Sequence, residues 1–140
     1  MRAIIDTCVI VDALQKREPF CGAAMDIFLA ASNRLFTGVI TAKAATDIYY
    51  IVRRELHSEV ETRKVLNTLF ALFEVADTFA LDCKTAVSLP INDYEDAVMA
   101  QTAVRISADY VITRNLKDYK ASPVPAISPV DFLELLAQGE

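Results

Sequence analysis

Four aspartates, Asp6, Asp47, Asp96 and Asp118, stand where carboxylate oxygens could do chemistry. Asp6 closes the apolar run of residues 3–5, and an ionised carboxylate in such a stretch needs a partner, hydrogen bonds or a cation. Mg²⁺ and Mn²⁺ prefer oxygen ligands, so a site for either ion requires no His or Cys. An ion held by these acids could activate a water molecule and hydrolyse a phosphodiester bond. We expect Asp6 and Asp96 to be direct ligands, and Asp47 and Asp118 to complete the cluster directly or through water.

Each acid also has an explanation in stability alone. Asp6 could cap a helix that follows the strand, because Asp is a favoured N-cap residue. Asp93, a possible additional acid of the site, could likewise cap a helix whose dipole stabilises Asp96 in the first turn. Asp47 lies four residues after Lys43 and could be the solvated half of a helical ion pair. A shared site explains better why acids recur at three strand ends and on one helix.

The segment of residues 113–118 has two explanations as well. Asn115 and Asp118 favour loops, because their side chains form hydrogen bonds with the backbone. If the segment belongs to the site, Asn115 could ligate the ion through its amide oxygen or contact the substrate. Hydroxyl groups and a guanidinium nearby are further candidates for binding phosphate or water: Thr7, Thr113 and Arg114.

Short apolar runs alternate with helical periods along the chain, which predicts an α/β fold with a parallel sheet covered on both faces. Strands are predicted at residues 3–5, 36–40, 74–76 and 110–113, with residues 123–127 leading into a last helix. Helices are predicted from Pro19 to about 31, from the cap Thr41 to about 54, from the cap Ser58 to 73, and at 80–88, 93–107 and 129–137. In such sheets, ligands bind beyond the carboxyl ends of the strands where the strand order switches.

The length of 140 residues predicts a single domain, residues 1–140, with a hydrophobic core of its own. Nineteen acids against fourteen bases give a net charge of −5, so bulk charge does not attract nucleic acid, and local cations must do so. Three cysteines fit neither a disulfide framework nor a zinc site. With no signal-peptide core and no apolar run of about 18 residues, we expect a cytoplasmic protein without a membrane contact.

Other reaction classes find less support. His57 is the only histidine, so a Ser-His or Cys-His triad would depend on it, and its position favours a surface or cap role. Gly22, Gly38 and Gly139 form no phosphate-binding loop. A receiver-like phospho-acceptor domain also clusters acids on a parallel sheet, but the lysine that it needs after a late strand is missing.

The residues around these acids resemble the PIN domains, and among them the VapC-like toxin ribonucleases of bacterial toxin-antitoxin pairs. The resemblance spans nearly the whole chain, through Ile5-Asp6-Thr7-Cys8-Val9-Ile10, Asp47, Tyr94-Glu95-Asp96-Ala97-Val98-Met99-Ala100 and Ile112-Thr113-Arg114-Asn115-Leu116-Lys117-Asp118-Tyr119. It implies a three-layer α/β/α sandwich, Mg²⁺ or Mn²⁺ held by three or four acids, and cleavage of single-stranded RNA or of a structured RNA loop. It also implies a homodimer and a cognate antitoxin protein.

Two positions depart from the usual PIN pattern. PIN domains more often carry Glu where Asp47 stands, and they frequently carry an acid at the position of Asn115 or three residues later, where Asp118 is the one acid here. A shorter side chain at position 47 could hold a metal through water. The alternative within the same fold is a catalytically inactive PIN-like module that binds RNA or protein.

Overall fold

The computed structural model describes residues 1–139 and contains a five-stranded sheet. The strands are β1 (Arg2–Ile5), β2 (Thr37–Thr41), β3 (Glu74–Ala76), β4 (Tyr110–Ile112) and β5 (Ala126–Ile127). Their order is β3-β2-β1-β4-β5, and all neighbouring pairs are parallel. The parallel sheet predicted from the sequence is confirmed.

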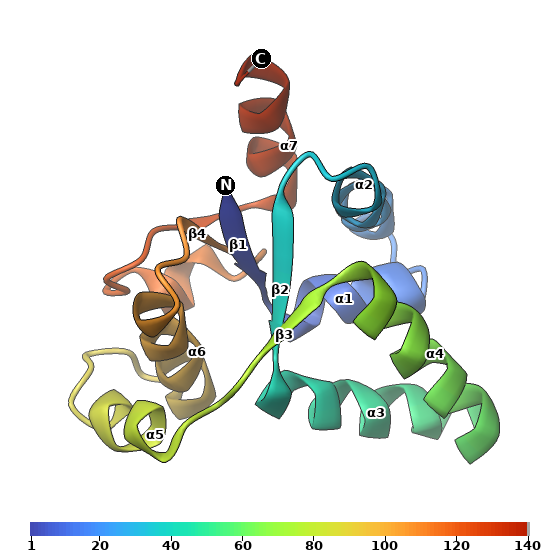
Figure 1. The fold of residues 1–140 in the computed structure, drawn as a ribbon, viewed down its shortest axis with the longest axis horizontal. Helices are drawn as coiled ribbons and strands as arrows, with labels where there is room; N and C mark the ends of the chain where they lie inside the picture. Colours follow the sequence, from blue (N-terminus) through green and yellow to red (C-terminus); the bar gives the residue numbers. More distant parts are fainter. Residues whose placement is uncertain (140) are drawn as a thin grey trace.

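Helices cover the sheet on both faces (Figure 1). The helices α1 (Thr7–Leu14), α2 (Cys21–Ser32), α3 (Ala42–Leu56), α4 (Glu59–Leu72) and α7 (Pro129–Gln138) pack as one connected group. The helices α5 (Ala80–Ala86) and α6 (Tyr94–Arg105) pack together on the other side of β1 and β2, and α6 also contacts the short 3₁₀ helix η1 (Leu116–Tyr119). This arrangement is the three-layer α/β/α sandwich.

The direction in which the chain adds strands to the sheet reverses between β1 and β4. From β1 the chain runs outward through β2 to β3, and then returns through α5 and α6 to β4 on the opposite side of β1. Because crossovers between parallel strands are right-handed, the outward and returning connections place their helices on opposite faces. The loops that follow β1 and β4 therefore diverge from adjacent strands and leave a crevice, the usual ligand position in open α/β sheets.

The centre of the sheet is the most buried part of the molecule. Ala3, Ile4 and Ile5 of β1 have no exposed surface, as expected of a central strand covered on both faces. Gly38 of β2 allows a close approach, since a Cβ atom there would meet the Phe73 ring at 2.7 Å. Leu69 and Phe73 are core residues.

Three predicted helix caps are present. Thr41 Oγ1 accepts a hydrogen bond from the Ala44 N–H at 3.0 Å, and Ser58 Oγ accepts one from the Glu61 N–H at 3.1 Å. Asp93 Oδ1 accepts one from the Asp96 N–H at 3.0 Å. Each cap satisfies a backbone donor that the helix itself cannot. Within residues 1–139, no helix is long and apolar enough to cross a membrane.

Candidate active site

A cavity of about 290 Å³ lies beyond the carboxyl end of β1, between α3 and α6. It is lined from four elements and their loops by Asp6, Thr7, Thr41, Lys43, Ala44, Asp47, Ile51, Thr78, Glu95, Asp96, Val98, Met99 and Thr102. Three of the four predicted acids and Thr7 therefore face one cavity. The cavity sits at the switch in strand order, where the sequence predicted a ligand.

Asp6 is a buried carboxylate whose side chain does not cap α1. It occupies the N-cap position but makes no capping hydrogen bond, and its Oδ2 instead accepts a hydrogen bond from Thr113 Oγ1 at 2.8 Å. This bond joins the ends of the adjacent strands β1 and β4. Burial raises the pKa of Asp6, although the bond from Thr113 opposes that shift. The stability explanation for Asp6, a helix cap, is therefore not the one that this geometry supports.

Asp96 lies in the first turn of α6 and faces the same cavity. Its Oδ1 accepts a hydrogen bond from the Tyr119 hydroxyl at 3.2 Å, while Asp93 caps the helix. Burial and the negative charges of Asp6, Asp93 and Asp118 together raise the pKa of Asp96 to about 7. A cation placed beside Asp96 would relieve this repulsion.

Asp47 faces the cavity but is engaged by a lysine. Lys43 Nζ lies 2.5 Å from Asp47 Oδ2 and 3.6 Å from Glu95 Oε1. Burial alone would lower the pKa of Lys43, but its bonds and proximity to these two carboxylates raise the pKa overall. The helical ion pair considered from the sequence is thus present, and it extends to a second acid on α6.

Asp118 and Asn115 lie on the loop after β4, outside the lining of the main cavity. Asp118 is exposed in η1 and borders a separate hollow formed by residues 114–118. It is near enough for its charge to raise the pKa of Asp96. The Asn115 N–H donates to Thr113 Oγ1 at 3.0 Å, so Thr113 connects this loop to Asp6.

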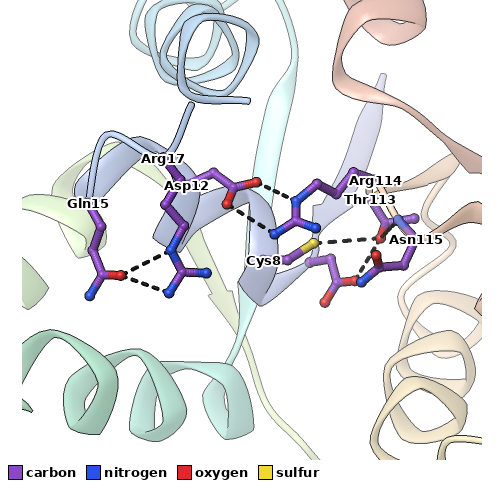
Figure 2. A network of polar contacts seen from close by, with 8 residues as sticks. Cys8, Asp12, Gln15, Arg17, Thr113, Arg114 and Asn115 are labelled. Atoms are coloured by element: carbon purple, nitrogen blue, oxygen red, sulfur yellow. Dashed lines mark hydrogen bonds and ion pairs between the residues drawn. The ribbon is translucent and has the colours of Figure 1, made fainter. Parts of the chain in front are cut away.

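Arg114 is held by a buried acid that sequence reasoning missed (Figure 2). Its Nε donates to Asp12 Oδ2 at 2.7 Å and its Nη2 to Asp12 Oδ1 at 3.2 Å, and the guanidinium stacks on the Phe20 ring. Asp12 is 1% exposed on α1. An acid inside an apolar helix was the available signal, but the sequence does not reveal its partner 102 positions away. The phosphate-binding role predicted for Arg114 stays a prediction, because the guanidinium here binds Asp12.

Two further side chains contact the residues of the site without lining the cavity. Tyr119 is 2% exposed, and its hydroxyl lies against Asp96 and, at 3.4 Å, the sulfur of Met99. Cys8 Sγ contacts Thr113 Oγ1 at 3.8 Å. Burial and the charge of Asp6 raise the pKa of the Cys8 thiol to about 11, which favours the protonated thiol over the nucleophilic thiolate at neutral pH.

The donor set suits a hard divalent cation only in part. Asp6 and Asp96 contribute oxygen ligands and mutual repulsion that a cation would offset. Across residues 1–139, however, no three His, Cys, Asp or Glu side chains lie close enough together to hold a metal ion. Asp47 is directed to Lys43 and Asp118 lies outside the cavity. The geometry thus supports a two-carboxylate core, with further ligands from water or substrate.

Comparisons with known proteins agree with this fold. Two neighbours are chains of VapBC2 from Rickettsia felis bound to a DNA fragment from its promoter (TM-score 0.68, 19% identity) and of a toxin-antitoxin complex from Klebsiella pneumoniae (0.67, 20%). A third is a chain of DNA-bound VapBC from Salmonella typhimurium (0.67, 18%). The alignments cover 91%, 91% and 92% of this chain and 98%, 97% and 98% of those chains, respectively. No curated protein sequence matches the chain.

A comparison of the sequence with protein families places the chain in one of them. The PIN domain family matches this chain over residues 2–117, which include Asp6, Asp47 and Asp96. PIN domains are generally nucleases that use divalent metal ions. The resemblance noted from the residues is therefore confirmed: the chain belongs to the PIN domain family.

Proposed function

We propose that this protein is a metal-dependent endoribonuclease that hydrolyses phosphodiester bonds of single-stranded RNA or of a structured RNA loop. The observation that carries the proposal is that the carboxylates of Asp6 and Asp96 face one cavity at the switch in strand order. Within residues 1–139, no basic side chain forms an ion pair with either of them. Burial raises the pKa values of both acids, and like charges raise that of Asp96 further, which indicates a site short of positive charge. The proposal treats residues 1–140 as one PIN-like domain.

Asp6 and Asp96 would hold the metal ion, Mg²⁺ or Mn²⁺. When bound, such an ion lowers the pKa of a water molecule and offsets the charge of the phosphate. Thr113 fixes the Asp6 carboxylate through the bond to Oδ2, and Tyr119 fixes that of Asp96 through Oδ1. Asp47, Asp118 and Asn115 are the candidates for completing the ligand set, and Thr7 lines the cavity where its hydroxyl could meet substrate.

We further propose that the protein is the toxin of a cytoplasmic toxin-antitoxin pair, and that it forms a homodimer inhibited by an antitoxin protein. Support comes from the structural neighbours, which are chains of toxin-antitoxin and VapBC complexes. Co-expression with the product of an adjacent small gene, followed by purification of a complex, would test this part of the proposal.

RNA cleavage by the purified protein tests the enzymatic proposal. We expect degradation of a fluorescently labelled single-stranded RNA in Mn²⁺ or Mg²⁺, and loss of that degradation in EDTA. Asp96→Asn should strongly reduce cleavage while the thermal unfolding midpoint does not fall. Asp26→Asn, at an exposed position on α2, is the matched control and should cleave normally. Cleavage that survives both EDTA and Asp96→Asn would overturn the metal mechanism.

A binding module without catalysis is the second candidate. The observation in its favour is that Asp47 bonds to Lys43 and Asp118 lies outside the cavity, so no three acids within residues 1–139 lie close enough together to hold a metal ion. Such a module would retain RNA or protein affinity and show no cleavage with either ion.

A further inference from the structure

We propose that Lys43 is the phosphate-binding residue of this site, and that Asp47 and Glu95 are positioning residues that hold its ammonium group at the cavity. The proposal deepens the proposed function and rests on it: the phosphate would belong to the RNA strand that carries the scissile bond. Of the three candidates for completing the metal-ligand set, Asp47 would then bind Lys43 and not the metal ion.

Lys43 is anchored from two helices. Its Nζ lies 2.5 Å from Asp47 Oδ2 on α3 and 3.6 Å from Glu95 Oε1 on α6. Its backbone N–H donates to Thr78 Oγ1 at 3.3 Å, and it sits in the first turn of α3, which Thr41 caps. A free lysine side chain loses rotamer entropy when it is ordered on a ligand, so the two ion pairs reduce the cost of that ordering.

The charge balance of the cavity requires a cation that faces substrate. Among the residues that line it, four are acids and Lys43 is the single base. A phosphodiester strand is an anion and is repelled by the acids, and a metal ion at Asp6 and Asp96 would offset only part of this charge. Lys43 lies on the α3 side of the same cavity, and its side chain is 42% exposed, so the ammonium group can reach an incoming phosphate.

An ordinary surface pair on the same protein shows what a merely stabilising contact looks like. Lys64 and Glu61 form an i,i+3 pair on α4 at 3.1 Å, with side chains 67% and 58% exposed and no place in the main cavity. Lys43 differs because it bridges two helices and lines the cavity with Asp6 and Asp96. Lys64→Met therefore serves as the matched control for Lys43→Met.

Three readouts test the assignment. The first is the affinity for a labelled single-stranded RNA 20-mer, measured by fluorescence anisotropy with Ca²⁺ in place of Mn²⁺ to slow cleavage, at several salt concentrations. The second is KM and kcat with Mn²⁺, and the third is Mn²⁺ binding measured by electron paramagnetic resonance. The variants are Lys43→Met, Lys43→Arg, Asp47→Asn and Lys64→Met.

We expect Lys43→Met to weaken RNA binding about 5-fold at low salt. The slope of log K against log salt should become shallower by about 0.7, because one phosphate contact on a single strand is lost. KM should rise more than kcat falls, and Lys43→Arg should restore most of the affinity because it keeps the charge. Mn²⁺ binding should not weaken in Lys43→Met or in Asp47→Asn. Lys64→Met should match the unmodified protein in all readouts.

The outcomes separate this inference from the proposed function. If the protein cleaves RNA but Lys43→Met keeps its affinity and salt slope, the inference is wrong and the nuclease proposal stands. If RNA binding depends on Lys43 while no metal supports cleavage, the nuclease proposal is wrong and the phosphate contact stands. Weaker Mn²⁺ binding in Asp47→Asn would return Asp47 to the metal ligands and overturn its positioning role.

Discussion

Carboxylates on the two sides of α6 have opposite surroundings. On the side toward α5, Asp82 is 2% exposed and its carboxylate accepts hydrogen bonds from Arg105 Nε at 2.9 and 3.1 Å and from the Phe79 N–H at 2.9 Å. Although burial opposes it, the bonds from Arg105 and Phe79 lower the pKa of Asp82 overall. In the cavity, Asp6 and Asp96 lack such a partner, and their pKa values are raised.

The two sides of α6 differ in whether the chain itself neutralises the charge of an acid or leaves that charge available to a ligand. A buried charge is strongly unfavourable unless a partner or hydrogen bonds compensate for it. Arg105 supplies that compensation for Asp82 within the chain itself. Asp6 and Asp96 accept hydrogen bonds from the hydroxyls of Thr113 and Tyr119 but pair with no base within residues 1–139, so under the proposed function a bound cation balances their charge. Under the proposed function, the Asp82–Arg105 pair stabilises the fold on one side of α6, whereas Asp6 and Asp96 on the other side sacrifice stability for binding.

Asp6→Asn gives the largest expected effect on activity. It removes the charge that would hold the cation and keeps the shape of the side chain, so RNA cleavage should fall about 1,000-fold, the equivalent of the several kcal/mol that a metal ion contributes. The free energy of unfolding should stay the same or rise, because the uncompensated charge is gone. Cleavage within 10-fold of the unmodified protein would contradict the comparison.

Arg105→Ala should have the opposite outcome, a loss of stability with cleavage intact in the folded fraction. It leaves the Asp82 carboxylate buried without its cation, which costs about 2 kcal/mol of unfolding free energy, less than the 3–5 typical of a fully buried pair because Arg105 is a quarter exposed. Urea denaturation measures this change. The double variant Asp82→Leu with Arg105→Met should recover most of the loss, and a loss below about 0.5 kcal/mol in Arg105→Ala would show that the pair matters little.

Local interactions explain which parts of the fold could be predicted from the sequence. Thr41, Ser58 and Asp93 cap helices through a bond to a residue three positions on, so the sequence itself contains both partners. The strand at residues 74–76 and the start of the last helix at Pro129 were likewise predicted where they occur. The rule for strand ends accounts for the position of Asp6 at the cavity, whereas Asp96 reaches it from the first turn of α6, which follows no strand.

Contacts between distant residues could not be predicted. Asp12 bonds to Arg114 across 102 positions, and Tyr119 bonds to Asp96 across 23, with no spacing rule that joins them. Asp47 was placed correctly on a helix at the cavity, but whether it bonds to Lys43 or to an ion depends on side-chain direction. The 3₁₀ helix η1 was expected only as a loop, because single turns leave little periodicity to read.

Tyr119→Phe tests how far hydroxyl groups compensate for the missing cation. The variant keeps the ring in the core and removes the hydroxyl, which bonds to Asp96 Oδ1 and orients that carboxylate, and which also contacts the sulfur of Met99. Hydrogen bonds that neighbouring residues donate to a metal-binding side chain change metal affinity by about 10–100-fold. We therefore expect Tyr119→Phe to bind Mn²⁺ about 10-fold more weakly, as measured by electron paramagnetic resonance. The thermal midpoint and the circular dichroism spectrum serve as controls for the fold. Unchanged Mn²⁺ affinity would show that Tyr119 only fills space.

The pH dependence of stability gives the smallest effect and the most direct measure of charge in the cavity. The pKa of Asp96 is about 7 in the folded protein against a reference value of 3.8, so the folded state holds the proton more tightly than the unfolded state. Stability of the metal-free protein should therefore fall as pH rises from about 4 to 7 and change little beyond, since the unfolded chain binds fewer protons in that range.

Asp96→Asn cannot ionise, so it should escape this decline. In EDTA, the thermal unfolding midpoint of Asp96→Asn should equal that of the unmodified protein near pH 4 and exceed it by about 3 °C above pH 7. For a chain of this size, that difference corresponds to about 1 kcal/mol of unfolding free energy. The expected effect is small because Asp96 is half-buried and its charge is screened by solvent. Asp26→Asn on the exposed surface of α2 should follow the unmodified protein at every pH. Parallel curves for Asp96→Asn and the unmodified protein would mean that the cavity already compensates Asp96, and that its acids resemble Asp82 after all.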